Sequence, residues 1–213
     1  MPFALVALLL TLLGAPIARA QAPLPTPGTR HTFALSESDF VLDGKPFQIR
    51  AGEMHPARIP PEYWRHRIQM AKAMGLNTIA AYVFWNHHEA HEGHFDFSTG
   101  TRDIARFVKI AQEEGMWVLL RPGPYVCAEW DFGGLPPYLL RDPDLRIRTM
   151  YPPYMQAAER YMARLADEVR PLLVTRGGPI LMVQVENEYG SYGNDRAYMA
   201  RLRDTWTRLG IDV

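Results

Sequence analysis

The amino-acid sequence predicts an α/β fold whose parallel sheet forms the N-terminal half of a (β/α)8 TIM barrel. Three observations support this prediction. Segments with apolar residues at helical spacing alternate along the chain with short runs that are apolar on both faces. Each helical segment ends at a glycine, which favours the left-handed conformation that closes a helix. Polar or aromatic residues follow the end of every apolar run.

The composition is that of a folded globular protein. Of the 213 residues, 47% are hydrophobic and 22% are charged, which excludes disordered, collagenous and coiled-coil chains. Lys and Arg together number 23, as do Asp and Glu, so no positive field exists to attract phosphates. We therefore expect no nucleic-acid partner. A single cysteine, Cys127, excludes an intrachain disulfide and a zinc ribbon.

Residues 1–20 have the pattern of a secretory signal peptide. An apolar run over residues 3–13 precedes Ala18-Arg19-Ala20, a small-x-small cleavage site. The run is much shorter than the ~20 residues that span a bilayer. We expect a secreted or periplasmic protein that has no membrane contact after cleavage. Residues 21–30 are expected to form a Pro-rich linker, and the folded domain is expected to occupy residues 31–213.

The first folded element is expected to be a hairpin. Phe40–Leu42 and Phe47–Ile49 flank Asp43-Gly44, a strong turn pair, and the second arm is expected to continue into Ala51-Gly52. Four amphipathic helices follow, each closed by a glycine. They cover Trp64–Met74, Ile104–Ala111, Ala158–Leu172 and Tyr198–Leu209, and are followed by Gly75, Gly115, Gly177 and Gly210.

Short apolar runs follow these glycines and are expected to be parallel strands that helices cover. They are Thr78–Trp85, Met116–Leu120, Ile180–Val185 and the first residues of another at Ile211. A doubly wound sheet and a barrel both satisfy this order. No glycine-rich phosphate loop follows the first strand, so the nucleotide-binding form of the doubly wound sheet has no support.

The strand ends favour the barrel. In a barrel, the polar side chains that follow each strand would meet at one mouth, where catalytic groups lie. These residues are Glu53 and His55; Tyr82, Trp85 and Asn86; Arg121 and Tyr125; and Glu186, Asn187 and Glu188. Four strand-and-helix units make half of such a barrel.

The candidate chemistry lies in carboxylates beside aromatic residues. Glu186 and Glu188 are two positions apart, which places them on the same side of an extended strand. Glu129 lies next to Trp130. A carboxyl in an aromatic cleft, close to a second carboxylate, can be kept protonated and so act as a general acid. The alternative is that these are solvated loop acids, and the residues themselves leave both interpretations open.

Four motifs, in order along the chain, resemble the glycoside hydrolase family 35 β-galactosidases. Together they extend from about Phe40 to the end of the chain. They are Leu42-Asp43-Gly44-Lys45-Pro46-Phe47; Trp85-Asn86-His87-His88-Glu89; Arg121-Pro122-Gly123-Pro124-Tyr125-Val126-Cys127-Ala128-Glu129-Trp130 with Phe132-Gly133-Gly134-Leu135-Pro136; and Gly177-Gly178-Pro179-Ile180 through Gln184-Val185-Glu186-Asn187-Glu188-Tyr189-Gly190-Ser191-Tyr192-Gly193.

The resemblance implies hydrolysis of terminal non-reducing β-D-galactosyl residues with retention of configuration, and no cofactor. The substrate would be a β-galactoside oligosaccharide or glycoconjugate. By the match of motifs, Glu188 would be the proton donor and Asn187 would hydrogen-bond the sugar 2-hydroxyl. Tyr82, Ala128 and Glu129 would line the galactose pocket, and Glu186 would lie behind the residues that touch the sugar. The family's nucleophile would lie beyond Val213, so residues 31–213 are expected to be an incomplete catalytic domain that is inactive on its own.

Two alternatives remain open. The first is a bound structural metal, because His87, His88, Glu89, His91, Glu92 and His94 crowd into eight residues. The spacing from His88 to His91 is one residue short of a zincin motif, and Gly93 disfavours a helix there, so we expect no metal. The second is a non-catalytic carbohydrate-binding protein or a vestigial half-barrel, because only one of the two carboxylates that a retaining enzyme needs is assigned.

Overall fold

The computed structural model describes residues 23–213, so the predicted signal peptide and the first two residues of the predicted linker lie outside the described residues. Residues 23–30 have neither helix nor strand. They nevertheless contact the folded domain. The Trp117 indole donates to the Pro23 carbonyl (3.2 Å), and the Gly28 amide donates to the Gly177 carbonyl (3.0 Å).

A small antiparallel sheet comes first in the chain. It consists of β1 (Phe33–Leu35), β2 (Phe40–Leu42) and β3 (Lys45–Pro46). Asp43 and Gly44 turn the chain between β2 and β3 with φ values of 51° and 75°, as a tight hairpin turn requires. The predicted second arm was wrong in extent. The arm ends at Pro46, although the Phe47 amide still donates to the Phe40 carbonyl (2.8 Å). The Phe47 ring is buried against Leu42 and Trp117, and Ala51 begins a strand of another sheet.

The second sheet is parallel and confirms the predicted fold class. In the described part of the chain it contains β4 (Ala51–Met54), β5 (Thr78–Tyr82), β6 (Trp117–Arg121) and β7 (Ile180–Val183), in that spatial order. Strands that follow one another in sequence are therefore neighbours in space, and all of them point the same way. Such sequential order is that of a barrel wall. The strand expected at Ile211 is absent from the described residues, although the Ile211 side chain is buried.

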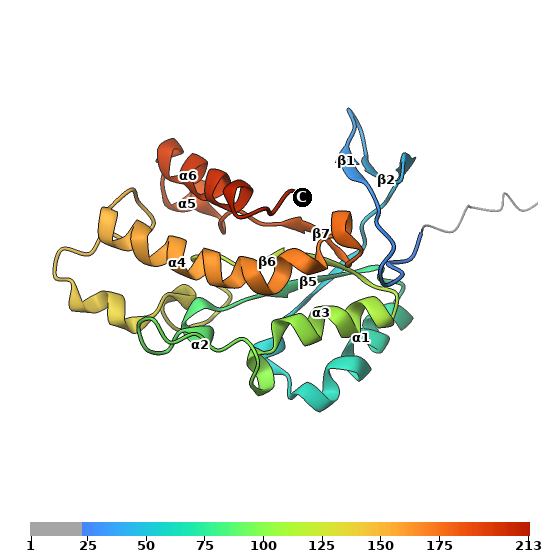
Figure 1. The fold of residues 1–213 in the computed structure, drawn as a ribbon, viewed down its shortest axis with the longest axis horizontal. Coiled ribbons are helices and arrows are strands. Elements are labelled where there is room, and N and C mark those ends of the chain that lie inside the picture. Colours follow the sequence, from blue (N-terminus) through green and yellow to red (C-terminus); the bar gives the residue numbers. More distant parts are fainter. Residues whose placement is uncertain (1–22) are drawn as a thin grey trace, which may run out of the picture.

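The helices are α1 (Trp64–Ala73), the short α2 (Trp85–His88), α3 (Ile104–Glu113), α4 (Pro152–Val169), the short α5 (Tyr189–Tyr192) and α6 (Arg196–Arg208). Figure 1 shows α1, α3 and α4 side by side along the sheet, with α6 beyond α4. The core between helices and sheet holds large fully buried side chains such as Trp64, Phe107 and Tyr161. No helix within residues 23–213 is long and apolar enough to cross a membrane.

Three of the four predicted glycine ends are confirmed. Gly75, Gly115 and Gly210 follow α1, α3 and α6 closely, and each has a positive φ. The predicted end of the third helix was wrong. α4 ends at Val169, because Pro171 has no backbone N–H to extend the ladder, and two 3-10 turns separate it from Gly177. Gly177 closes the second of these turns in the left-handed conformation, with φ of 89°.

Candidate active site

Arg121, the last residue of β6, connects the carboxyl ends of all the strands described in the parallel sheet. Its guanidinium donates to Glu53 Oε2 (2.7 Å) on β4, and to Gln184 Oε1 (2.8 Å) and Asn187 Oδ1 (2.9 Å) after β7. It also lies over the ring of Tyr82 at the end of β5, 4.1 Å from the ring centroid. The predicted convergence is therefore present for Glu53, Tyr82, Arg121 and Asn187, with Arg121 at its centre. It was wrong for Trp85, which is fully buried and stacks on Tyr161 of α4, and for Glu186, which is buried behind the mouth.

The β4 and β5 side of this mouth consists of aromatic and acidic side chains. His55 bonds Glu53 through Nε2 (2.7 Å) and packs its ring edge-on against Tyr82, with 4.9 Å between centroids. Burial raises the pKa of Tyr82, and the nearby carboxylates of Glu53 and Glu188 raise it further, although Arg121 opposes them. Tyr82 is thus a neutral phenol that can donate a hydrogen bond, and Glu188 is close enough for its charge to act on it.

The loop after β6 has an unusual backbone. Cys127, Ala128 and Glu129 are consecutive non-glycine residues with left-handed φ values of 58°, 53° and 46°. Such residues cost about 1–3 kcal/mol each and occur mainly where a binding site requires the shape. Arg58 supports this loop by donating to the carbonyls of Ala128 (3.0 Å) and Glu129 (2.6 Å). The Glu129 side chain is exposed, whereas Ala128 is buried.

Trp130 anchors the same loop to the start of α2, which follows β5. Its ring stacks on Phe84, with centroids 4.0 Å apart and planes within 6° of parallel. Its indole N–H donates to Asn86 Oδ1 at 2.7 Å. The guanidinium of Arg58 lies over both rings, 4.9 Å from Trp130 and 5.6 Å from Phe84. The carboxylate of Glu129 is therefore carried by a loop that is fixed on both sides.

The segment after β7 corrects one prediction. β7 ends at Val183, so Glu186 and Glu188 are not on one face of a strand. Glu186 is buried and forms an ion pair with Arg148, whereas Glu188 is exposed and has a left-handed backbone, with φ of 51°. Burial raises the pKa of Glu186 above its ordinary value, although Arg148, the Asn187 amide and the Tyr198 hydroxyl lower it. The two glutamates therefore have different environments and different chemical capacities.

The structure thus places four of the five predicted site residues in two pairs, each of which contacts one arginine. Tyr82 and Asn187 contact Arg121, and Ala128 and Glu129 are bonded by Arg58. Glu188 follows Asn187 directly and is exposed at the same sheet edge.

Sequence reasoning missed Arg58 and Arg148, and no periodic signal marks either of them. Arg148 is found only through the structure, where it forms an ion pair with the buried Glu186.

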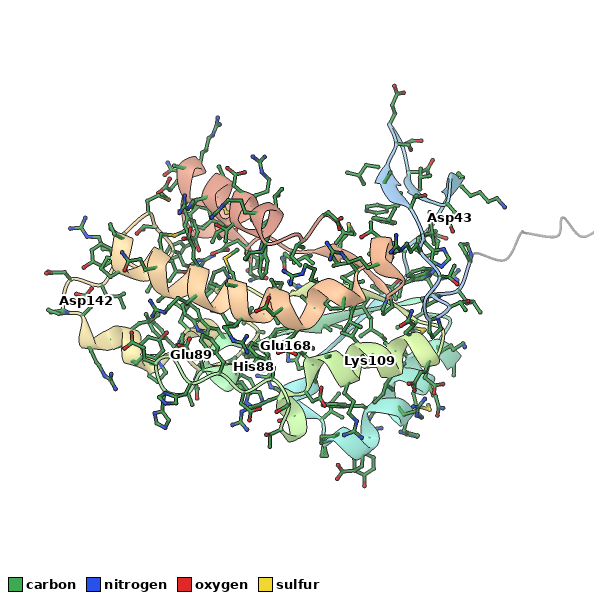
Figure 2. The ribbon with its side chains drawn as sticks, viewed as in Figure 1. Asp43, His88, Glu89, Lys109, Asp142 and Glu168 are labelled. Carbon is green, nitrogen blue, oxygen red and sulfur yellow. The ribbon has the colours of Figure 1, made fainter. Side chains whose placement is uncertain are left out.

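The histidine-rich segment 87–94 is a different kind of cluster. Glu89 is fully buried and accepts hydrogen bonds from the Trp85 indole (2.5 Å), the Tyr138 hydroxyl (3.0 Å) and the Gly93 amide (2.7 Å). Figure 2 labels Glu89 and its neighbour His88 below α4. Among residues 23–213, no group of three His, Cys, Asp or Glu side chains is arranged to hold a metal ion.

Comparison with solved structures confirms the barrel class. An exo-beta-1,4-mannosidase from Opitutaceae bacterium strain TAV5 superimposes with a TM-score of 0.61 and 16% identity, over 80% of this chain and 31% of that chain. A GH5_18 protein from Streptomyces cattleya superimposes with a TM-score of 0.59 and 15% identity, over 77% of this chain and 42% of that one. At such low identity the likeness shows the fold alone, which is that of part of a (β/α)8 barrel.

The family follows from the sequence comparisons. The model for glycosyl hydrolases family 35 matches residues 39–212, and the chain belongs to that family. A beta-galactosidase of Xanthomonas manihotis is 49% identical over 191 residues, which are 90% of this chain and 32% of the relative. Human beta-galactosidase-1-like protein 2 is 50% identical over 173 residues, 81% of this chain and 27% of the relative. The chain therefore spans about a third of the length of such relatives.

Proposed function

We propose that this chain supplies the acid half of the active site of a retaining β-galactosidase that removes terminal non-reducing β-D-galactosyl residues. Glu188 protonates the glycosidic oxygen and later takes a proton from water. The nucleophile, a second carboxylate ~5 Å from the acid, would come from the part of the relatives that this chain does not cover. No cofactor is needed for this chemistry.

The observation that carries this proposal is the linkage of Asn187 to the rest of the mouth through Arg121. Because the Asn187 side-chain oxygen accepts from Arg121 at 2.9 Å, its NH2 group is the part that can donate to a sugar hydroxyl. Tyr82 can donate from its phenol, and the exposed Glu129 carboxylate can accept from hydroxyls. A monosaccharide between these residues would lie beside Glu188, the next residue after Asn187.

The test is Glu188→Gln in the full-length protein. General acid catalysis accelerates such reactions by about 10²–10⁴-fold. The kcat/KM should therefore fall by that factor for alkyl galactosides, whose leaving groups need protonation. Aryl galactosides with good leaving groups should be affected far less. Glu168→Gln on the outer surface of α4 is the control and should change neither. Equal losses for good and poor leaving groups would exclude Glu188 as the donor.

The proposal for the pocket has its own test. Glu129→Ala should raise KM and lower kcat together, because an acid that accepts sugar hydroxyls acts in both the ground state and the transition state. Glu129→Gln, which keeps one acceptor oxygen, should have a smaller effect. Unchanged kinetics in the alanine variant would make Glu129 a solvated loop acid with no contact to the sugar.

Export belongs to the same proposal. The apolar run over residues 3–13 and the site at Ala18-Arg19-Ala20 support cleavage after Ala20, with the mature protein secreted or periplasmic. Expression of the whole chain in a bacterium with an intact secretion pathway, followed by N-terminal sequencing, checks this. A mature chain that begins at Gln21 is expected, and retention of Met1 in the exported or the cytoplasmic fraction would contradict it.

A further inference from the structure

Behind the mouth lies a buried ion pair between Arg148 and Glu186. Arg148 comes from the loop before α4 and is 3% exposed, and Glu186 is 5% exposed. The guanidinium and the carboxylate meet as two forks, Nε to Oε1 and Nη2 to Oε2, both at 2.8 Å. Replacing such a buried pair with apolar residues is often neutral or stabilising, so global stability alone is a weak explanation for it.

The pair holds the backbone on both sides of the Asn187 Cα atom, at the N–H and at the carbonyl. Glu186 Oε2 accepts from the Asn187 amide at 2.5 Å, and Arg148 Nη2 donates to the Asn187 carbonyl at 2.6 Å. On the other side of Glu188, the Tyr189 hydroxyl donates to the Arg148 carbonyl at 3.1 Å. The residues before and after Glu188 are therefore both fixed to Arg148.

Glu188 itself needs this support. Its backbone is left-handed, with φ of 51°, a conformation that a non-glycine residue adopts at a cost. With Asn187 and Tyr189 both held, the chain between them has little freedom to relax to an ordinary conformation. The direction of the Glu188 side chain follows from that backbone.

Aromatic rings fix the plane of the Arg148 guanidinium. It lies 4.0 Å from the ring centroid of Tyr125, 4.1 Å from that of Tyr192 and 5.5 Å from that of Tyr189. The rings restrict the planar guanidinium to one orientation. In that orientation its N–H groups reach both Glu186 and Asn187. A lysine would keep the charge here but could not make the same set of bonds.

We propose that Arg148 and Glu186 are positioning residues that set the backbone on either side of Glu188 and thereby aim its carboxyl at the glycosidic oxygen. They touch no sugar and act only through the 187–189 segment. This inference rests on the proposed role of Glu188 and deepens it. The two residues are 38 positions apart in the sequence. Their ion pair therefore joins the loop before α4 and the segment after β7 into one unit of the site.

The first experiment is Arg148→Lys in the full-length protein. A displacement of about 1 Å at a catalytic group costs about 10²-fold, so kcat/KM should fall by that factor for alkyl galactosides and much less for aryl galactosides with good leaving groups. Charge balance alone would be satisfied by lysine. A purely structural role for Arg148 therefore predicts that both classes of substrate change by the same factor, or not at all, and this result would overturn the inference.

The paired variant Arg148→Met with Glu186→Leu decides the matter if the lysine variant does not fold, since it leaves no buried charge unpaired. It should fold and show the same leaving-group dependence. The matched control removes the ion pair of Arg201 and Glu159, which joins α6 to α4 away from the mouth, as Arg201→Met with Glu159→Leu. That control should leave the leaving-group dependence unchanged, and wild-type kinetics in the folded Arg148 and Glu186 variant would also overturn the inference.

Failure of the inference and failure of the proposed function are distinguishable. If Glu188→Gln lacks the leaving-group pattern, Glu188 is not the acid and the proposed function fails with it. If Glu188→Gln shows the pattern and neither Arg148 variant does, Glu188 is the acid and only the positioning role is wrong.

Discussion

Two dense clusters of ionisable and aromatic side chains differ in how their polar atoms are used. The mouth cluster is formed by Glu53, His55, Tyr82, Arg121 and Asn187, which join side chain to side chain across strands. The loop cluster is formed by the segment 85–94 after β5. There, most polar contacts run to backbone atoms of the same loop or to buried side chains around it.

The difference separates a cluster that keeps hydrogen-bonding groups unused from one that spends them on holding the chain. In the loop cluster, His88 bonds the Asp96 carbonyl through Nδ1. Both oxygens of Glu89 accept hydrogen bonds, three in all, so this carboxylate is fully used in holding the chain. In the mouth cluster, Tyr82 and Asn187 still have a hydroxyl and an amide group to offer. In the sequence, both clusters look alike, because both are dense in titratable residues. Only the structure shows that their polar atoms are bonded differently.

The largest expected effect comes from Glu89→Leu in the loop cluster. The substitution would leave the Trp85 indole, the Tyr138 hydroxyl and the Gly93 amide without their acceptor. The free energy of unfolding should fall by about 3–5 kcal/mol, since each buried unsatisfied donor costs about 1–3 kcal/mol. Urea denaturation of the full-length protein measures this.

The control for Glu89 is its exposed neighbour in the same cluster. Glu92 forms surface ion pairs with Arg160 and Arg141, and Glu92→Leu should leave the urea midpoint almost unchanged. If the two substitutions had equal effects, the loop cluster would not be held through Glu89, and its contrast with the mouth cluster would be lost.

The second effect is a pH dependence that should arise in the loop cluster. Burial lowers the pKa of His88 to about 3, against 6.5 for a free imidazole, although the Asp96 carbonyl opposes the shift. The unfolded chain binds a proton below pH 6.5 and the folded chain does not. The stability contributed by neutral His88 is therefore complete above pH 6.5 and is lost as the pH falls from 6.5 towards 3.

The measurement compares wild type with His88→Gln, whose amide can still donate to the Asp96 carbonyl. Between pH 6.5 and pH 5, the wild type should lose about 2 kcal/mol more than the variant, at ~1.4 kcal/mol for each pH unit. The exposed His91→Gln is the control and should keep the wild-type slope. The pKa of His87 is also lowered, chiefly by burial, and His87 is kept in all three proteins.

A smaller effect is expected from Arg121→Met in the mouth cluster. Asn187 would lose the hydrogen bond that orients its amide, so kcat/KM should fall about tenfold, the equivalent of one hydrogen bond to a charged group. Good and poor leaving groups should suffer alike, because the sugar and not the proton is misplaced. This uniform loss distinguishes Arg121 from Arg148.

Arg102→Met is the matched control in the loop cluster. Arg102 donates to the His87 carbonyl at 2.7 Å and makes no contact with the mouth cluster among the interactions of residues 23–213. Its loss should lower stability without changing kcat/KM. A kinetic effect from Arg102 as large as that from Arg121 would mean that the two clusters are coupled.

Local rules explain which parts of the fold were predictable. Gly75, Gly115 and Gly210 were identified because left-handed backbone after a helix is a property of glycine itself. The end of α4 was not, because apolar spacing continues beyond Val169 and only the missing N–H of Pro171 stops the helix. The hairpin arm failed for a similar reason, since Phe47 alternates like a strand residue but is buried beside Trp117.

The site was predictable only where it depends on strand order. Polar residues after parallel strands must converge, so Tyr82, Arg121 and Asn187 could be grouped from the sequence. The opposite environments of Glu186 and Glu188 could not be predicted, because they depend on a left-handed turn and on Arg148, which contacts Glu186 from 38 positions away. Contacts of that kind have no local signature.

The smallest expected effect is that of metal removal, and it tests the loop cluster where the sequence was most ambiguous. His87 Nε2 lies 3.0 Å from Thr101 Oγ1, His88 Nδ1 lies 2.9 Å from the Asp96 carbonyl, and both Glu89 oxygens accept hydrogen bonds. A zinc ion needs three or four ligands turned to one point, and no group of three His, Cys, Asp or Glu side chains among residues 23–213 is arranged in that way. EDTA should therefore leave the thermal unfolding midpoint unchanged, and mass spectrometry of the dialysed protein should find no stoichiometric metal. A stoichiometric ion that His91→Gln with His94→Gln removes would make the loop cluster a metal site, and its contrast with the mouth cluster would then be wrong.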